Sequence, residues 1–238
     1  MKTKAWHRSI GAWLFLPTLY FVGMFFNKEW LTLSLFVYLA VAITITSGYH
    51  RLFNHMSYQC NKIWHYVFGF IGCASLNSSP VEWSTVHTQH HRYSDTENDP
   101  YESNFKYYLR FKDRTGIKAT KREVRMMQDS MHRFFVKHSL SIALVTMLIC
   151  SLNPMLFLYG YALPVTAYLV TAGLQTIFSH GPNNVRNLWL LEFLIPMAGE
   201  WLHGVHHDNA SLNNFSTKPY YLDIGGLFIK VIRNVKSN

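Results

Sequence analysis

The chain has 238 residues, 49% of them hydrophobic, and a formal net charge of +9. Its apolar residues occur in long uncharged runs instead of periodic stripes, which indicates a protein of the lipid bilayer and argues against a soluble globular domain. Three cysteines without framework spacing exclude a disulfide scaffold, so we expect Cys60, Cys73 and Cys150 to be free in a reducing compartment.

Four apolar runs are predicted to cross the membrane as helices. Residues 9–26 and 30–49 carry no charge, and each run is long enough to cross a hydrocarbon core of roughly 30 Å. A second pair, 134–152 and 155–178, is interrupted by an Asn-Pro dipeptide that predicts a tight turn at the far surface. The first run lacks a small-residue cleavage site, so we expect a retained anchor rather than a signal peptide.

The charge distribution predicts the orientation of the chain. With four spans, twenty-one of the twenty-two Lys and Arg residues fall on one side, which the positive-inside rule assigns to the cytoplasm. Both termini and a helical cap made of residues 50–133 and 179–238 are then cytoplasmic. The apolar run 63–76 is too short to cross, so it is expected to lie in the membrane interface or to re-enter. We expect an all-α integral membrane protein in which residues 1–238 form a single domain.

Eight of the thirteen histidines occur in three tight clusters. The clusters are His50 and His55; His87, His90 and His91; and His203, His206 and His207. Imidazole is the commonest neutral metal ligand, and a single ion would leave several rings unused, so the clusters predict a site for more than one metal ion. Four isolated histidines are expected to be ordinary surface or core residues: His7, His65, His132 and His138.

The spacing within each cluster predicts which rings act together. On a helix, residues i and i+4 project along one face while i+3 lies on its flank. His87 and His91 are therefore predicted to share one ion while His90 reaches a second, and the third cluster repeats this pattern. His50 and His55 are five residues apart and do not share a face of an ideal α-helix, so a frayed or bent helix end is expected there.

Together the clusters resemble the three histidine boxes of the integral-membrane fatty acid desaturases, most closely the acyl-CoA delta-9 branch. The resemblance extends from about residue 9 to 230 and includes segments outside the boxes. The matching segments are His50–His55, Glu82-Trp83, His87–Thr96, Asp99-Pro100, Gly199–His207 and Asp223.

The resemblance implies two irons held by nine histidines, of which the ninth is His180 at the end of the last span. The first iron would be bound by His50, His55, His87, His91 and His206, and the second by His90, His180, His203 and His207. Thr176 stands where the family usually has an Asn that holds a water on the second iron. Gly204 likewise stands where an Asn is usual, and the stretch from His180 to His203 is shorter than in animal members of the family, so the loop between them is expected to differ.

Several side chains beside the boxes are expected to support the site. Ligand histidines usually donate their other N–H to a carboxylate or carbonyl group, and Glu200 and Asp95 are predicted to accept these bonds. Asp99 and Asp208 stay open between this role and solvated surface charge. Trp83 matches a tryptophan that lines the substrate tunnel of the family, although an aromatic residue beside a box is as often ordinary packing.

The activity implied by the resemblance is insertion of a cis double bond into a saturated fatty acyl chain with O2 and two electrons. The resemblance to the delta-9 branch implies a delta-9 position for this bond. The acyl group could be carried as acyl-CoA, on acyl carrier protein or in a lipid. A separate ferredoxin or b-type cytochrome is expected to supply the electrons, because the chain contains no electron-transfer domain. Its short length suggests the inner membrane of a bacterium.

Two other functions are compatible with histidine clusters in a membrane protein. A fatty acyl or lipid hydroxylase on the same scaffold starts with the same hydrogen abstraction, whereas a metal transporter would place its ligands near the bilayer midplane. A soluble di-iron bundle needs two Glu-x-x-His motifs, and only one occurs, at residues 200–203.

The basic stretch 106–137 fits anionic lipid headgroups, an acidic electron carrier or CoA phosphates equally well. Nucleic acid is not an expected partner.

Overall fold

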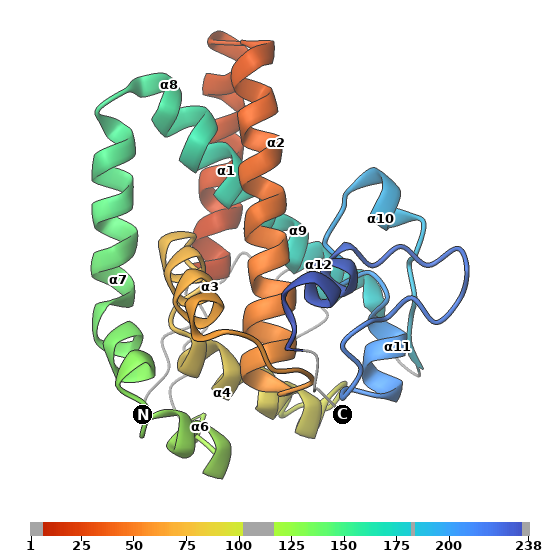
Figure 1. Cartoon of the computed structure of the whole chain (residues 1–238). Coiled ribbons are helices and arrows are strands. Elements are labelled where there is room, and N and C mark those ends of the chain that lie inside the picture. The colour runs from red at the N-terminus through yellow and green to blue at the C-terminus, as the bar shows by residue number, and fades with distance from the viewer. Residues whose placement is uncertain (1–6, 102–116, 182–183, 235–238) are drawn as a thin grey trace.

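A computed structural model describes residues 7–101, 117–181 and 184–234, and the described chain is mainly helical. Two helical hairpins rise from one end of the molecule (Figure 1). The first joins α1 (His7–Met24) to α2 (Lys28–Ile43), which continues as the π-helix η1 (Thr44–Asn54). The second joins α7 (Ser130–Ser151) to a continuous helical rod that consists of α8 (Pro154–Phe157), the π-helix η2 (Leu158–Ala162) and α9 (Leu163–Ser179).

Three of these helical rods are long and apolar enough to cross a membrane: Lys28–Asn54, Ser130–Ser151 and Pro154–Ser179. The apolar part of α1, Trp13–Met24, is shorter. The predicted turn between the second pair of runs is present, because Leu152 ends α7 and the side chain of Asn153 caps the next helix by accepting the N–H groups of Met155 and Leu156. The four-span topology itself stays a prediction.

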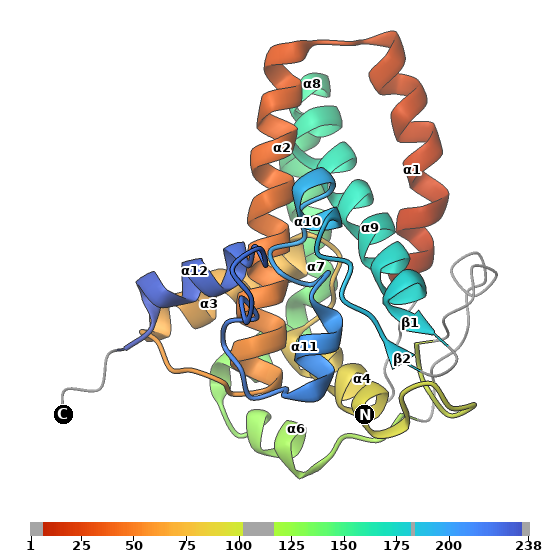
Figure 2. The ribbon, with the colours of Figure 1, turned by 90° about the vertical axis from the view of Figure 1, so that its right-hand side faces the viewer.

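The remaining elements gather at the opposite end from the two hairpin turns (Figure 2). They are α3 (Lys62–Ala74), α4 (Pro80–Tyr93), α6 (Lys121–Met126), the two-residue strands β1 (His180–Gly181) and β2 (Asn184–Val185), α10 (Leu191–Leu194), α11 (His203–Asp208) and α12 (Ile224–Ile232). The strands pair antiparallel, with His180 opposite Val185. All three cysteines are free, as expected.

An ion pair fastens the C-terminal region to η1. The guanidinium of Arg51 donates to both carboxylate oxygens of Asp223, at 2.8 and 3.1 Å, and stacks over the ring of Phe215 at 3.7 Å. Both charged side chains are almost fully buried. Removing one partner of such a pair leaves an unpaired buried charge and typically costs about 3–5 kcal/mol, so the pair firmly fixes the third histidine cluster against the first.

Small residues allow η1, α3 and α7 to pack closely. A Cβ atom at Gly48 would collide with the ring of Phe68, and one at Gly69 would collide with Phe135 of α7. At Gly72 it would collide with the ring of Tyr49, whose hydroxyl donates to the carbonyl of Ser78 at 3.0 Å. The close packing of the helix that carries the first histidine cluster therefore depends on its own Gly48 and on Gly72 of α3.

We predict that Gly72→Ala destabilises the protein by about 1–3 kcal/mol, because the added methyl overpacks the contact with Tyr49. Thermal unfolding in detergent would measure the change. Gly23→Ala is the matched control, since nothing lies within 4 Å of a Cβ at that position. Equal unfolding temperatures for the two variants would contradict the proposed close contact.

Candidate metal centre

Nine histidine rings converge where η1, α4, β1 and α11 meet, and they form two groups. The first contains His50, His55, His87, His91 and His206, and the second contains His90, His180, His203 and His207. Within each group the nearest ring nitrogens all lie within 4.8 Å of one another. These are the two sets that the family resemblance implied, including His180, which no cluster in the sequence contains.

The π-helical form of η1 brings His50 and His55 together. The N–H of His55 bonds the carbonyl of His50 at 3.0 Å, so residues five apart stand one turn above each other. The two ring centroids are 5.0 Å apart. Of the two expected alternatives, a frayed or a bent helix end, the frayed end was wrong: the helix stays ordered to Asn54 and changes its hydrogen-bond register. The second predicted span accordingly does not end at residue 49 but continues to Asn54.

The second cluster lies on α4, which has a well-defined start. Pro80 occupies the first turn, and Ser79 and Glu82 form a reciprocal capping box. One and a half turns later, the Nε2 atoms of His87 and His91 face each other at 3.0 Å. His90 points to the other group. On α11 the Nε2 atoms of His203 and His207 are likewise 3.1 Å apart.

The Nε2 atoms converge from different elements. In the first group, the Nε2 of His206 is 3.0 Å from that of His50 and 2.8 Å from that of His91. In the second, the Nε2 atoms of His180 and His203 are 2.9 Å apart, and the buried Nε2 of His90 has no hydrogen-bond partner. A cation at the centre of each group would give these converging nitrogens a common partner.

Three carboxylates fix the direction of the rings. The Nδ1 atom of His50 lies 2.8 Å from Glu200, that of His90 2.9 Å from Asp99, and that of His180 3.0 Å from Asp95. A carboxylate only accepts, so in each ring Nδ1 carries the proton and Nε2 presents its lone pair to the group.

Two of these contacts, from Glu200 and Asp95, were predicted. Asp99, which the sequence left open, makes the same type of contact. Among the described residues, the exposed Asp208 makes no hydrogen bond or ion pair with a histidine ring.

Burial keeps the rings neutral. The pKa of seven rings is lowered, first because burial disfavours the charged form and then because neighbouring rings repel a second charge. It is lowered to about 3 at His91 and to about 2 at His207, and also lowered at His55, His87, His180, His203 and His206. Neutral imidazole is the form that binds metal. Glu200 stays ionised, because the contacts with His50, Arg51 and Thr46 outweigh its burial and lower its pKa.

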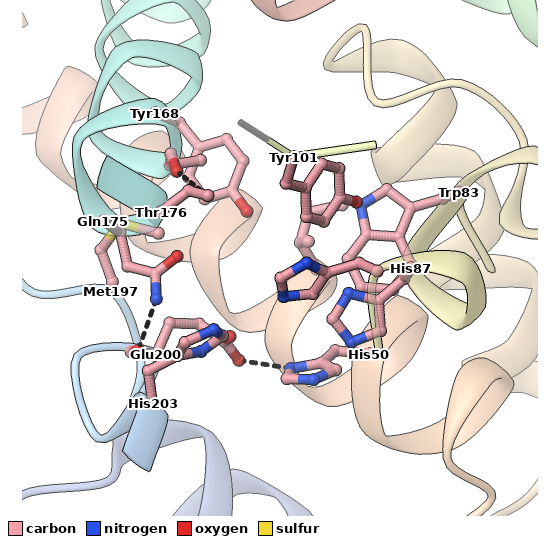
Figure 3. A pocket seen from close by; sticks show the side chains of 13 residues that line it. His50, Trp83, His87, Tyr101, Tyr168, Gln175, Thr176, Met197, Glu200 and His203 are labelled. Atoms are coloured by element: carbon pink, nitrogen blue, oxygen red, sulfur yellow. Dashed lines mark hydrogen bonds and ion pairs between the residues drawn. The ribbon is translucent and has the colours of Figure 1, made fainter. Parts of the chain in front are cut away.

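A small cavity of about 40 Å³ touches both groups (Figure 3). His50 and His87 of the first group and His90 and His203 of the second line it. Trp83, predicted to line a tunnel, is in its wall and stacks on His87 with ring centroids 4.6 Å apart.

Polar and aromatic side chains complete the cavity wall. Thr176 lines it and donates its hydroxyl to the carbonyl of Ala172 at 3.1 Å. The other lining side chains could not be predicted from the sequence, because they come from separate segments of the chain. They include Tyr101, Tyr168, Gln175 and Met197.

The segment before the third cluster is held by a buried carboxylate. Glu192 of α10 accepts the backbone N–H groups of Met197, Gly199 and Trp201 at 2.8 to 3.0 Å. Burial raises the pKa of Glu192 to about 7, and the three N–H groups oppose this rise.

The close packing of the loop before α11 explains why a glycine stands at position 204. A Cβ at this position would lie 2.8 Å from the side-chain nitrogen of Asn187 and 2.9 Å from the carbonyl of Val185. Asn187 instead accepts the N–H of Val205 at 3.0 Å. Asn187 and β2 thus fill the space beside Gly204, and no larger side chain fits there without a shift.

We predict that the metal-free protein loses stability as the pH falls from about 7 to 5. An unfolded histidine takes up a proton near its ordinary pKa of about 6.5, whereas the seven rings whose pKa is lowered in the folded protein take up fewer protons over this range. The unfolded state then binds more protons, so the free energy of unfolding falls, by at most roughly 1.4 kcal/mol per ring for each pH unit. Unfolding of chelator-treated protein at constant ionic strength would measure this. A flat profile would contradict neutral, buried rings.

No family model matches the chain. It is similar to Acyl-CoA desaturase 1 of Saccharomyces cerevisiae, with 33% identity over 119 residues that cover 48% of this chain and 23% of the yeast protein. Delta-9 acyl-lipid desaturase 1 of Arabidopsis thaliana is 33% identical over 81 residues, 33% of this chain and 27% of the plant protein. The sn-1 stearoyl-lipid 9-desaturase of Anabaena variabilis is 32% identical over 99 residues, 37% of this chain and 36% of that protein. The matched segments thus span about a quarter to a third of these relatives.

Proposed function

Because the chain is a relative of the acyl-CoA and acyl-lipid desaturases, we propose that it is a membrane di-iron acyl desaturase. In this proposal it inserts a cis double bond into a saturated fatty acyl chain with O2 and two electrons. The observation that carries the proposal is the convergence of nine imidazoles in two groups on one cavity, next to helices apolar enough to cross a membrane.

The donor set fits two irons. Five imidazole nitrogens face the first position and four face the second, and imidazole suits iron. When bound, the irons would supply an oxidant strong enough to remove hydrogen from an unactivated methylene group, which no side-chain acid or base can do. Glu200, Asp99 and Asp95 orient one ring each and raise its basicity.

The cavity wall would position the acyl chain. Trp83 and Tyr168 present apolar ring surface from opposite sides of the cavity (Figure 3), while Gln175 is held by a bond of 3.1 Å to the carbonyl of Glu200. Thr176 lies on the wall near the second group and would place its hydroxyl where a water could be held. Among the relatives, several are named as delta-9 or 9-desaturases, which supports this position for the double bond. The acyl carrier could be CoA, a carrier protein or a lipid.

The proposal includes a topology of four spans with one cytoplasmic cap and both termini in the cytoplasm. Three long apolar helices, the shorter apolar helix α1 and the excess of Lys and Arg on one side support it. The single domain 1–238 and a separate electron donor, a ferredoxin or b-type cytochrome, belong to the same proposal. The expected bacterial inner membrane has no support from the relatives, which include yeast and plant proteins.

The decisive experiment is the fatty acid profile of a desaturase-deficient host that expresses the protein, with double bonds located by gas chromatography and mass spectrometry of disulfide adducts. We expect a new cis-monoene, and at least a hundredfold less of it with His90→Ala, which removes a ring nitrogen of the second group. His65→Ala, outside both groups, is the matched control and should keep the activity. New hydroxy acids in place of the monoene would favour a hydroxylase, and iron bound without any product would favour a metal carrier.

We predict that Asp99→Asn lowers iron affinity about 10- to 100-fold, because the amide no longer draws the Nδ1 proton of His90 as a charged acceptor does. Competition with a chelator would measure the affinity. Asp208→Asn is the matched control, since Asp208 is exposed. Equal affinities in the two variants, with unchanged unfolding temperatures, would refute a role for Asp99 in the site.

A further inference from the structure

The segment between α9 and the third histidine cluster exposes large apolar side chains. Leu190 at the start of α10 is 59% exposed, Phe193 is 59% exposed and Leu194 is 75% exposed. Ile195, which follows the helix, is 42% exposed. We call these four side chains the α10 patch. A protein surface that meets only water rarely carries such a group, which marks contact with a membrane or with another protein.

Helical geometry gathers most of the patch on one face of α10. Leu190 is the N-cap residue and already has helical dihedral angles, so Phe193 and Leu194, three and four residues further, project from the same face. Glu192 projects from the opposite face and is buried. Its carboxylate accepts three backbone N–H groups of residues 197–201, which fastens α10 to the protein and leaves the apolar face turned outward.

The patch stands beside the apolar rods. In both Figure 1 and Figure 2, α10 is closer to the hairpin turns than α3, α11 and α12 are. Leu191 packs against the core cluster that includes Tyr38 of α2 and Tyr168 of α9. Just after α10, the carbonyl of Met197 accepts the hydroxyl of Thr46 at 3.2 Å, and Thr46 lies within the apolar rod Lys28–Asn54. The α10 patch is therefore next to surface that lipid would surround.

Aromatic and basic side chains border the patch. The ring of Trp189 is 6.4 Å from that of Phe193 and 4.9 Å from that of Tyr220, and Tyr220 is exposed. The ammonium of Lys218 is 5.9 Å from the ring of Tyr220. Trp and Tyr are enriched where a membrane meets water, and lysine there extends its charge toward the headgroups. The border thus has the composition of a membrane interface.

The carboxylates of this segment leave the patch free of negative charge. Between residues 184 and 223, Glu192 and Asp223 are buried, and Glu200 is bonded to His50 and Thr46. Asp208 is exposed at the end of α11, which is farther from the hairpin turns than α10. The other exposed carboxylates among the described residues belong to different elements: Glu29 at the start of α2, Asp95 and Glu97 after α4, and Asp129 before α7.

We propose that the α10 patch inserts into the bilayer leaflet nearer to the histidine groups, with Trp189, Tyr220 and Lys218 at the level of the headgroups. The proposed cytoplasmic cap would then enter the membrane without crossing it, between the last span and the third cluster. A bilayer fits the patch better than a second copy of the chain, because lipid already surrounds the rods at this level. The inference rests on the membrane topology of the proposed function and is independent of the reaction.

Insertion would couple the bilayer to the metal centre. Glu192 binds the N–H groups of Gly199 and Trp201, which flank Glu200 in the chain. Glu200 in turn directs the ring of His50. Lipid that holds α10 in place would therefore also steady one of the carboxylates that orient the histidine rings.

The test uses the full chain in phosphatidylcholine nanodiscs, with a nitroxide spin label on one introduced cysteine. Leu194→Cys probes the patch, Leu144→Cys on α7 is the control in lipid, and Lys121→Cys on α6 is the control in water. All three replaced side chains are exposed, so the label does not disturb the core. Each protein also carries Cys150→Ser, because the two other native cysteines are buried.

Power saturation of the nitroxide signal measures its collisions with O2, which concentrates in lipid, and with a nickel chelate, which stays in water. We expect O2 to relax the labels at positions 194 and 144 more strongly than the nickel chelate does, and the reverse order at position 121. A nickel effect at position 194 as strong as that at position 121 would place the patch in water and overturn the insertion.

Protection of the label at position 194 from both reagents would also overturn the insertion. Spin–spin broadening that disappears on dilution with unlabelled protein would then identify a second copy as the cover, and no broadening would identify another part of the same chain. The order expected for water at position 144 as well would refute the membrane topology itself. Failure of the desaturase reaction is separate, because it would leave all three labels unchanged.

Discussion

The structure depends on the convergence of nine imidazole rings, six buried and three partly exposed, whose Nε2 atoms point inward to two centres. Buried polar atoms without partners are costly, so an acceptor outside the group stabilises a buried ring in one direction. Glu200, Asp99 and Asp95 do this for one ring each from different segments. The surrounding protein is arranged so that neutral nitrogens converge, and a bound cation would relieve the mutual crowding of their lone pairs.

Buried charged groups, together with apolar packing, hold the segments that carry the rings. Arg51, next to His50, pairs with Asp223 near the C-terminus, and Glu192 gathers the backbone just before His203. These buried bonds are directional, so they fix the third cluster in register with the first two. The apolar rods, in contrast, serve mainly to place this assembly beside the membrane.

The histidine assembly has a covered side and an open side. The cavity is lined from η1, α4 and α9 and reaches His50, His87, His90 and His203, whereas three other rings, His55, His91 and His207, are partly exposed. The rings of His91 and His207 stack with centroids 4.8 Å apart, so the two groups are in contact on the open side.

By itself, the sequence determined the apolar rods, the turn at Asn153 and the division of His87, His90 and His91 between two groups, because helical spacing is a local property. Neither the π-helical register that unites His50 with His55 nor the contact of Asp99 could be predicted, and His180 was found only by family resemblance. Tyr101, Gln175 and Met197 gave no signal. The first two contacts span only five and nine residues, and the local backbone conformation decides them. Only the tertiary structure decides which helix faces meet, because this depends on packing between distant segments, as where His50 lies against Glu200, 150 residues away.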